Sequence, residues 1–124
     1  MKLVSRGKSR ALKLLITLIS SDAMAASTKS LRSYHLVLRR TSITSLGNLQ
    51  SVGGNLYLYN TPIQSLGNLQ SVGDDLDLER TPIQSLGNLK SVGGYLDLRE
   101  TPLSKKYSKE EIRQMVDVKG QIYM

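Results

Sequence analysis

The chain has 124 residues, a length typical of a single domain. It contains no Phe and no Trp, so its hydrophobic core must be built from Leu, Ile and Val. It also contains no Cys, which excludes disulfides, thiolate metal sites and cysteine nucleophiles.

The net charge of +7 is unevenly distributed along the chain. Residues 1–40 contain nine Lys and Arg against one acidic residue, whereas residues 41–100 contain three basic residues against six acidic ones. Such an asymmetry indicates either a basic segment that meets an anionic surface or a solvated basic cap, and we favour the cap.

The N-terminal segment, residues 1–33, allows two interpretations. Basic residues precede the apolar run 14–19 and the small residues 23–26, which is the order found in a secretory signal peptide. The apolar run is short for that purpose, and a helix over about 9–20 is the alternative that we favour. This helix would cap the structure that follows and would suit an anionic membrane surface, although it is too short to span a membrane. Its apolar face would carry Leu12, Leu15, Ile16 and Ile19.

Three nearly identical blocks of 20 residues follow, at 41–60, 61–80 and 81–100, and a fourth begins at Thr101. A fixed period of this length predicts a solenoid, in which each block is one turn and buries its apolar side against its neighbours. Within each block, a Leu-x-Leu alternation predicts a strand with one buried face. Because the strand recurs one block later, neighbouring strands should run parallel. Extending this phase to both ends predicts five strands, near 36–38, 56–58, 76–78, 96–98 and 122–124.

Glycine pairs and Thr-Pro pairs bracket each predicted strand. A pair such as Gly53-Gly54 comes before the strand, where we expect a corner with positive φ. Thr61-Pro62 and its copies come after the strand. Pro has no backbone N–H and cannot donate a hydrogen bond to a neighbouring strand, and the Thr hydroxyl can bond to backbone groups that the turn leaves unpaired. The rest of the block should return through turns and short 3₁₀ pieces, with its Leu and Val side chains pointing inward.

Residues 104–124 are predicted to cap the C-terminal end of the solenoid. The sequence from Ser108 to Glu111 has the form of a capping box that opens a helix over about 109–116. We expect Ile112, Met115 and Val116 to lie on the face of this helix that covers the core.

The blocks resemble the leucine-rich repeat family over about residues 34–103. The segment Leu56-Tyr57-Leu58-Tyr59-Asn60-Thr61-Pro62-Ile63 matches the second half of the pattern Leu-x-x-Leu-x-Leu-x-x-Asn/Cys-x-Leu, with Thr61 in place of Asn. The short period is similar to that of small repeat proteins of bacteria, their phages and large viruses. The resemblance implies an α/β solenoid with helical caps at both ends. It also implies a protein-binding module that uses the outward residues of its strands.

Those outward positions change between blocks, whereas the inward positions barely change. They combine tyrosine, arginine and carboxylates, which is typical of hot spots for protein recognition. The alternative is that they are solvated strand positions, where Tyr is favoured by strand propensity. The predicted partner-binding residues are Arg39, Tyr57, Tyr59, Asp75, Asp77, Glu79, Tyr95, Asp97 and Arg99.

The sequence offers little for catalysis or metal binding. His35 is the only His, and no phosphate loop, zinc motif or Ser-His-Asp spacing is present. The carboxylates lie on adjacent strand positions that diverge too little to wrap Ca²⁺, and nothing supplies the cleft that sugar hydrolysis requires. We therefore expect no enzyme activity, no catalytic, cofactor or metal site, and no small-molecule substrate.

Three functions are left open. The first is a non-enzymatic module that binds a protein partner through its parallel sheet face, for example as a phage or bacterial accessory or inhibitor protein. The second is binding of nucleic acid or an anionic membrane through residues 1–40. The third is a structural or assembly role through the ends of the solenoid. The compartment is open as well, with a cytoplasmic location slightly favoured over a secreted one.

Overall fold

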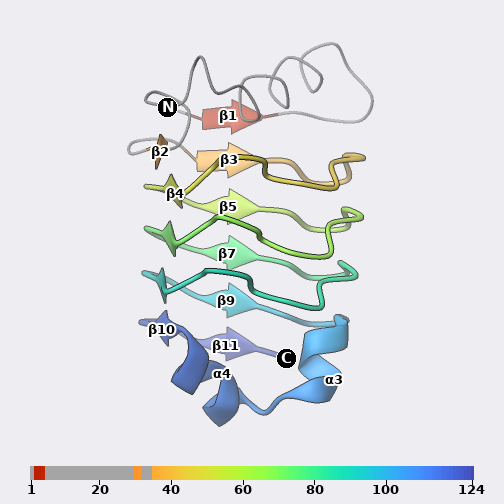
Figure 1. Ribbon diagram of the computed structural model, residues 1–124, viewed down its shortest axis with the longest axis vertical. Coiled ribbons are helices and arrows are strands. Elements are labelled where there is room, and N and C mark those ends of the chain that lie inside the picture. The colour runs from red at the N-terminus through yellow and green to blue at the C-terminus, as the bar shows by residue number, and fades with distance from the viewer. Residues whose placement is uncertain (1, 5–29, 32–34) are drawn as a thin grey trace.

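The computed structural model describes residues 2–4, 30–31 and 35–124, and these form a β-solenoid whose turns stack along one axis (Figure 1). Each repeat contributes one strand to each of two parallel sheets. In spatial order, the six-stranded sheet contains β1 (Lys2–Val4), β3 (His35–Val37), β5 (Leu56–Tyr57), β7 (Leu76–Asp77), β9 (Leu96–Asp97) and β11 (Ile122–Tyr123). The five-stranded sheet contains β10 (Asp117–Val118), β8 (Ser91–Val92), β6 (Ser71–Val72), β4 (Ser51–Val52) and β2 (Ser30–Leu31).

The register of the six-stranded sheet follows the sequence repeat. Leu56 pairs with Leu76, and Leu76 pairs with Leu96, so equivalent residues lie side by side. The phase continues at both ends, where Leu36 pairs with Leu56 and Ile122 pairs with Leu96. The five predicted strands are therefore confirmed, and β1 adds a sixth that the sequence did not predict.

Leu, Ile and Val side chains from all the described turns form one buried cluster between the two sheets. Inward residues such as Leu56, Leu58 and Ile63 are fully buried. Burial of each such side chain stabilises the fold by about 1.5–3 kcal/mol, so the stacked rows supply most of the stabilisation. The rows predicted to point inward from the return side are also buried: Leu46, Leu66, Leu86, Leu49, Leu69, Leu89, Val52, Val72 and Val92.

The return side differs in its secondary structure from the prediction. Its Ser-Val dipeptides pair in register as β4, β6 and β8, and 3₁₀ segments are absent from the described residues. A strand of only two residues is too short to show the alternation of apolar and polar residues by which a strand is recognised in a sequence. The second sheet therefore arises from the stacking of the turns and not from a local strand signal.

The glycines before each strand of the six-stranded sheet allow close packing between turns. A Cβ added to Gly73 would overlap the carbonyl oxygen of Gly53, and a Cβ on Gly93 would overlap that of Gly73. The expectation of positive φ at these corners was wrong. Among the described residues, positive φ occurs at Gly47, Gly67 and Gly87, and at Arg40, Asn60, Arg80 and Glu100 in the turns after the strands.

A buried threonine closes each of those turns. The Thr61 hydroxyl donates a hydrogen bond to the carbonyl oxygen of Leu58 at 2.9 Å. Equivalent bonds are made by Thr41, Thr81 and Thr101. The prediction that this hydroxyl satisfies backbone left unpaired by the turn is confirmed.

Two short helices cover the C-terminal end of the solenoid, α3 (Pro102–Lys106) and α4 (Lys109–Met115) (Figure 1). The Ser108 hydroxyl accepts a hydrogen bond from the Glu111 backbone N–H at 3.2 Å, which confirms the predicted N-cap of α4. Ile112 and Val116 are buried, but Met115 is 47% exposed, so its predicted inward orientation was wrong.

The helix α3 was not predicted. Thr101 caps it by accepting a hydrogen bond from the Ser104 N–H at 3.2 Å, and Pro102 stands in its first turn. The helix expected over 9–20 lies outside the described residues. None of the described helices is long and apolar enough to cross a membrane.

Candidate functional site

The outward side chains of the six-stranded sheet form the surface with the most varied chemistry, and we call it the sheet face. Leu residues at even positions of each strand point into the core, so the odd positions point outward. Three rows result, one along each set of equivalent positions. The first row is His35, Asn55, Asp75 and Tyr95; the central row is Val37, Tyr57, Asp77, Asp97 and Tyr123; the turn row is Arg39, Tyr59, Glu79 and Arg99.

The first row is a hydrogen-bonded ladder. His35 Nδ1 accepts from the Asn55 backbone N–H at 2.7 Å, and Asn55 Oδ1 accepts from the Asp75 N–H at 2.9 Å. Asp75 Oδ1 in turn accepts from the Tyr95 N–H at 2.9 Å. The ladder fixes these side chains between adjacent turns, so this row has a structural role in addition to any role at the surface.

The central row places two carboxylates side by side. Asp77 and Asp97 are register partners, flanked in the same row by Tyr57 and Tyr123. Asp77 is half-buried, and its Oδ1 accepts from the Glu79 backbone N–H at 3.0 Å. Burial raises the pKa of Asp77, and the nearby charges of Asp97 and Glu79 raise it further, while the hydrogen bond from the Glu79 backbone and the charge of Arg39 oppose the shift.

Arg99 neutralises the second of these carboxylates. Asp97 is only 3% exposed. Arg99 donates two hydrogen bonds to its carboxylate, from Nε to Oδ1 at 3.0 Å and from Nη2 to Oδ2 at 2.7 Å. The same Nη2 lies 3.3 Å from Glu79 Oε2. Hydrogen bonding to Asp97 and its negative charge raise the pKa of Arg99. A bidentate pair of this kind holds the guanidinium in one orientation.

Arginines also lie over the tyrosine rings of the face. The guanidinium carbon of Arg39 is 4.6 Å from the centre of the Tyr57 ring, within the range of a cation–π contact. Tyr59 has Arg40 and Arg80 each at 5.8 Å from its ring centre, and Arg80 also donates to its hydroxyl at 2.9 Å. These contacts order side chains that would otherwise be free to rotate.

Tyr123 completes the face near the C-terminal end. Its ring meets that of Tyr95 edge to face, with centres 5.6 Å apart and planes at 76°, and Arg99 lies 5.7 Å from its centre. Burial, followed by the charge of Asp77, raises the pKa of Tyr95 to about 12. Burial, followed by the charge of Asp75, raises the pKa of Tyr57 as well.

Eight of the nine residues predicted to bind a partner are at least partly exposed on this face. The ninth, Asp97, is buried, so its place in the structure is beneath Arg99. Sequence reasoning did not select Tyr123, although Ile122-Tyr123 has the same phase as Leu56-Tyr57. The predicted set also omits Arg40 and Arg80, which the sequence places at outward positions next to the strands and which contact Tyr59.

Three carboxylates of the face converge in a way that resembles a metal site. Oxygen atoms of Asp77, Glu79 and Asp97 lie within 4.8 Å of one another. The Arg99 guanidinium, however, already binds two of the three groups. Two of the three carboxylates, Glu79 and Asp97, therefore already have a cation of the chain as their partner.

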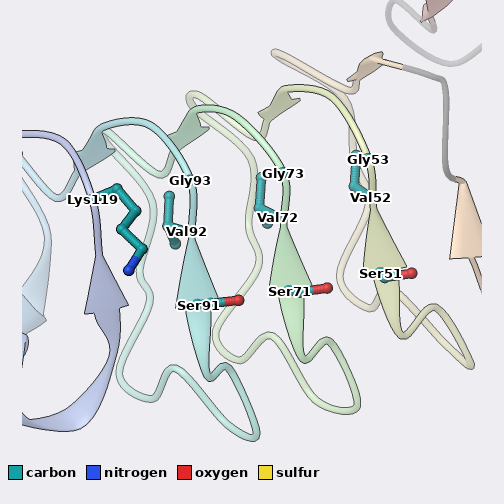
Figure 2. A pocket seen from close by; sticks show the side chains of 10 residues that line it. All are labelled: Ser51, Val52, Gly53, Ser71, Val72, Gly73, Ser91, Val92, Gly93 and Lys119. Atoms are coloured by element: carbon teal, nitrogen blue, oxygen red, sulfur yellow. The ribbon is translucent and has the colours of Figure 1, made fainter.

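The five-stranded sheet presents a different surface, a shallow open groove of about 530 Å³. Ser51, Ser71 and Ser91 project from β4, β6 and β8, beside a row of glycines (Figure 2). Lys119 is the charged residue of its lining and pairs with Asp117 at 3.0 Å. This uniform surface of hydroxyls and glycines contrasts with the aromatic and charged sheet face, which we take as the candidate site.

The chain matches no protein-family model, no curated protein and no solved structure. The structure itself establishes a solenoid built from repeats of 20 residues, with parallel strands in two sheets.

Proposed function

We propose that the protein is a non-enzymatic module that binds a protein partner on its sheet face. The observation that carries this proposal is the set of tyrosine rings held by arginine guanidinium groups on that face: Tyr57 with Arg39, Tyr59 with Arg40 and Arg80, and Tyr123 with Arg99. Tyr and Arg are the residues most enriched in interface hot spots, together with Trp. Side chains that are already ordered lose less conformational entropy on binding.

The proposal extends to the kind of repeat and to the biological role. The buried Leu-x-Leu strands and the 20-residue register support membership of the leucine-rich repeats. In that family the strand face is the usual binding surface, in keeping with the extended surfaces of stacked repeats. The small size of such a binding module is compatible with an accessory or inhibitor protein of a bacterium or phage.

Capture experiments with the full chain as bait test the proposal. The variant Tyr57→Ala/Tyr59→Ala/Asp77→Ala changes one neighbourhood of the sheet face and leaves the buried columns unchanged. We expect at least about tenfold less capture of the partner from a lysate of the native cells, because removing two hot-spot aromatics weakens binding by several kcal/mol. Circular dichroism should show that the solenoid is retained.

A matched control lies on the opposite side of the solenoid. The exposed residues Gln50, Gln70 and Lys90 form an equivalent row next to the five-stranded sheet. Their replacement by Ala should leave capture unchanged. Equal capture by the wild type and the sheet-face variant would contradict the proposal.

A further inference from the structure

The carboxylates of the sheet face are not equally neutralised. Arg99 pairs with Asp97 and Glu79, and Arg80 pairs with Glu100. The remaining two, Asp75 and Asp77, have no Lys or Arg within ion-pair distance among the described residues. Arg39 acts on Asp77 through its charge but forms no ion pair with it, so the middle of the face carries two carboxylates that no described ion pair neutralises.

The hydrogen bonds of Asp75 and Asp77 do not require that charge. Each uses Oδ1 to accept one backbone N–H, from Tyr95 and from Glu79 respectively. Asn55 makes the same contact as Asp75 with a neutral amide oxygen, one turn earlier in the ladder. A neutral side chain thus suffices for the fold at this position, and the charges are available to a ligand.

Two tyrosines flank this pair of carboxylates. Tyr57 is the register partner of Asp77, and Tyr95 donates its backbone N–H to Asp75. Tyr57 lies in β5 and Tyr95 immediately precedes β9, and these strands lie on either side of β7, two strand spacings or roughly 10 Å apart. A single ammonium or guanidinium group fits a site of that width, where carboxylates and aromatic rings both attract a cation.

We propose that the partner contributes a lysine or arginine side chain, which docks over Asp75 and Asp77 between Tyr57 and Tyr95. This inference rests on the proposed function and specifies the partner's contact surface as a basic one. The face already binds cations of its own in this manner, since Arg39 lies over Tyr57 and Arg99 lies over Tyr123. An incoming cation would meet the ring of Tyr95 and two carboxylates that form no ion pair among the described residues, beside the Arg39 that already lies over Tyr57.

A displayed library of random peptides, selected on the full-length protein, tests the inference. We expect the selected peptides to be enriched in Lys or Arg. Their affinity should fall at least about tenfold for the variant Asp75→Asn/Asp77→Asn, in which the amide oxygens can still accept both backbone hydrogen bonds. Synthetic copies with citrulline in place of Arg, or acetyl-lysine in place of Lys, should lose affinity for the wild type by a similar factor.

Two further variants separate the possible failures. Gln70→Ala/Lys90→Ala, on the other side of the solenoid, should bind the selected peptides as well as the wild type does. This inference is wrong, while the proposed function stands, if the peptides lose affinity in Tyr57→Ala/Tyr59→Ala but contain no basic residue. The same holds if their affinity is unchanged in Asp75→Asn/Asp77→Asn. If no selected peptide loses affinity in Tyr57→Ala/Tyr59→Ala, both are wrong.

Discussion

Asp77 and Asp97 occupy equivalent positions in adjacent strands, yet their surroundings give them different roles. Asp97 is buried under Arg99 and is neutralised by it. Asp77 is half-buried beside Asp97 and Glu79 and forms no ion pair with the described residues, and burial raises its pKa above the usual 3.8 against the opposing charge of Arg39. The ionised form of Asp77 is therefore disfavoured in the folded protein relative to the unfolded chain.

Replacing this aspartate should stabilise the fold at neutral pH. Because the folded pKa is raised, the contribution of Asp77 to stability is fully present below pH 3.8 and is lost as the pH rises through the folded pKa. The free energy of unfolding of Asp77→Asn should match that of the wild type in acid and exceed it at neutral pH. Urea unfolding followed by circular dichroism across this pH range measures the difference.

An exposed aspartate provides the control. The Asp117 side chain is 61% exposed and pairs with Lys119 at the surface, so Asp117→Asn should change stability by less than about 1 kcal/mol. A neutral-pH stability of Asp77→Asn below that of the wild type would contradict the account of Asp77. So would a difference that does not vary with pH.

At the scale of single elements, the corner before each strand depends on the absence of a Cβ. Gly93→Ala should destabilise the protein by about 3 kcal/mol or more, because the new methyl group would overlap the backbone carbonyl of Gly73 in the adjacent turn. Chemical denaturation monitored by circular dichroism measures this loss.

Gly67 is the matched control for this corner. A Cβ added at Gly67 meets no atom within 4 Å, and its φ of +56° is the only obstacle to substitution. Gly67→Ala should therefore cost only about 1–2 kcal/mol. Equal losses for the two variants would show that close packing is not what the corner requires.

The elements were predictable wherever the sequence carries a strong local signal. The Leu-x-Leu strands and the Ser108 cap were both found in this way. The Ser-Val strands were missed because two residues carry no period, and α3 was missed because Thr101-Pro102 reads like the Thr-Pro turns of the earlier repeats. The alternation of inward Leu and outward variable residues was sufficient to locate the sheet face. The burial of Asp97, however, depends on Arg99 and on the packing of adjacent turns. Such contacts between turns cannot be inferred from one strand alone.

At the scale of the whole molecule, the solenoid is a stack of interchangeable turns. Equivalent residues of neighbouring repeats are 20 positions apart in both sheets, as in the pairs Ser51–Ser71 and Leu56–Leu76. The free energy of unfolding of such a stack is approximately the sum of the contributions of the single turns and of the interfaces between neighbouring turns. The register between two neighbouring turns should therefore survive the removal of a complete turn.

Deletion of residues 61–80 tests this modularity. Asn60 would then precede Thr81, the buried Leu columns would stay in phase, and Gly53 would meet Gly93 as it now meets Gly73. We expect a folded protein with a β-sheet circular dichroism spectrum and a lower denaturation midpoint, because one turn and one interface are lost. Deletion of residues 61–70 alone should abolish cooperative unfolding, since half a turn places inward residues out of phase with their neighbours.

The same deletion removes Asp75 and Asp77 and makes β5, which carries Tyr57, the neighbour of β9, which Tyr95 precedes. The shortened solenoid should therefore fold but lose affinity for Lys- and Arg-containing peptides, as is expected of the variant Asp75→Asn/Asp77→Asn. Stability and recognition would then be separable properties of this molecule, the first set by how many turns are stacked and the second by which outward residues the turns present. If the 61–80 deletion unfolded the protein as completely as the half-turn deletion, the turns would not be interchangeable, and the additive view of the stack would fail.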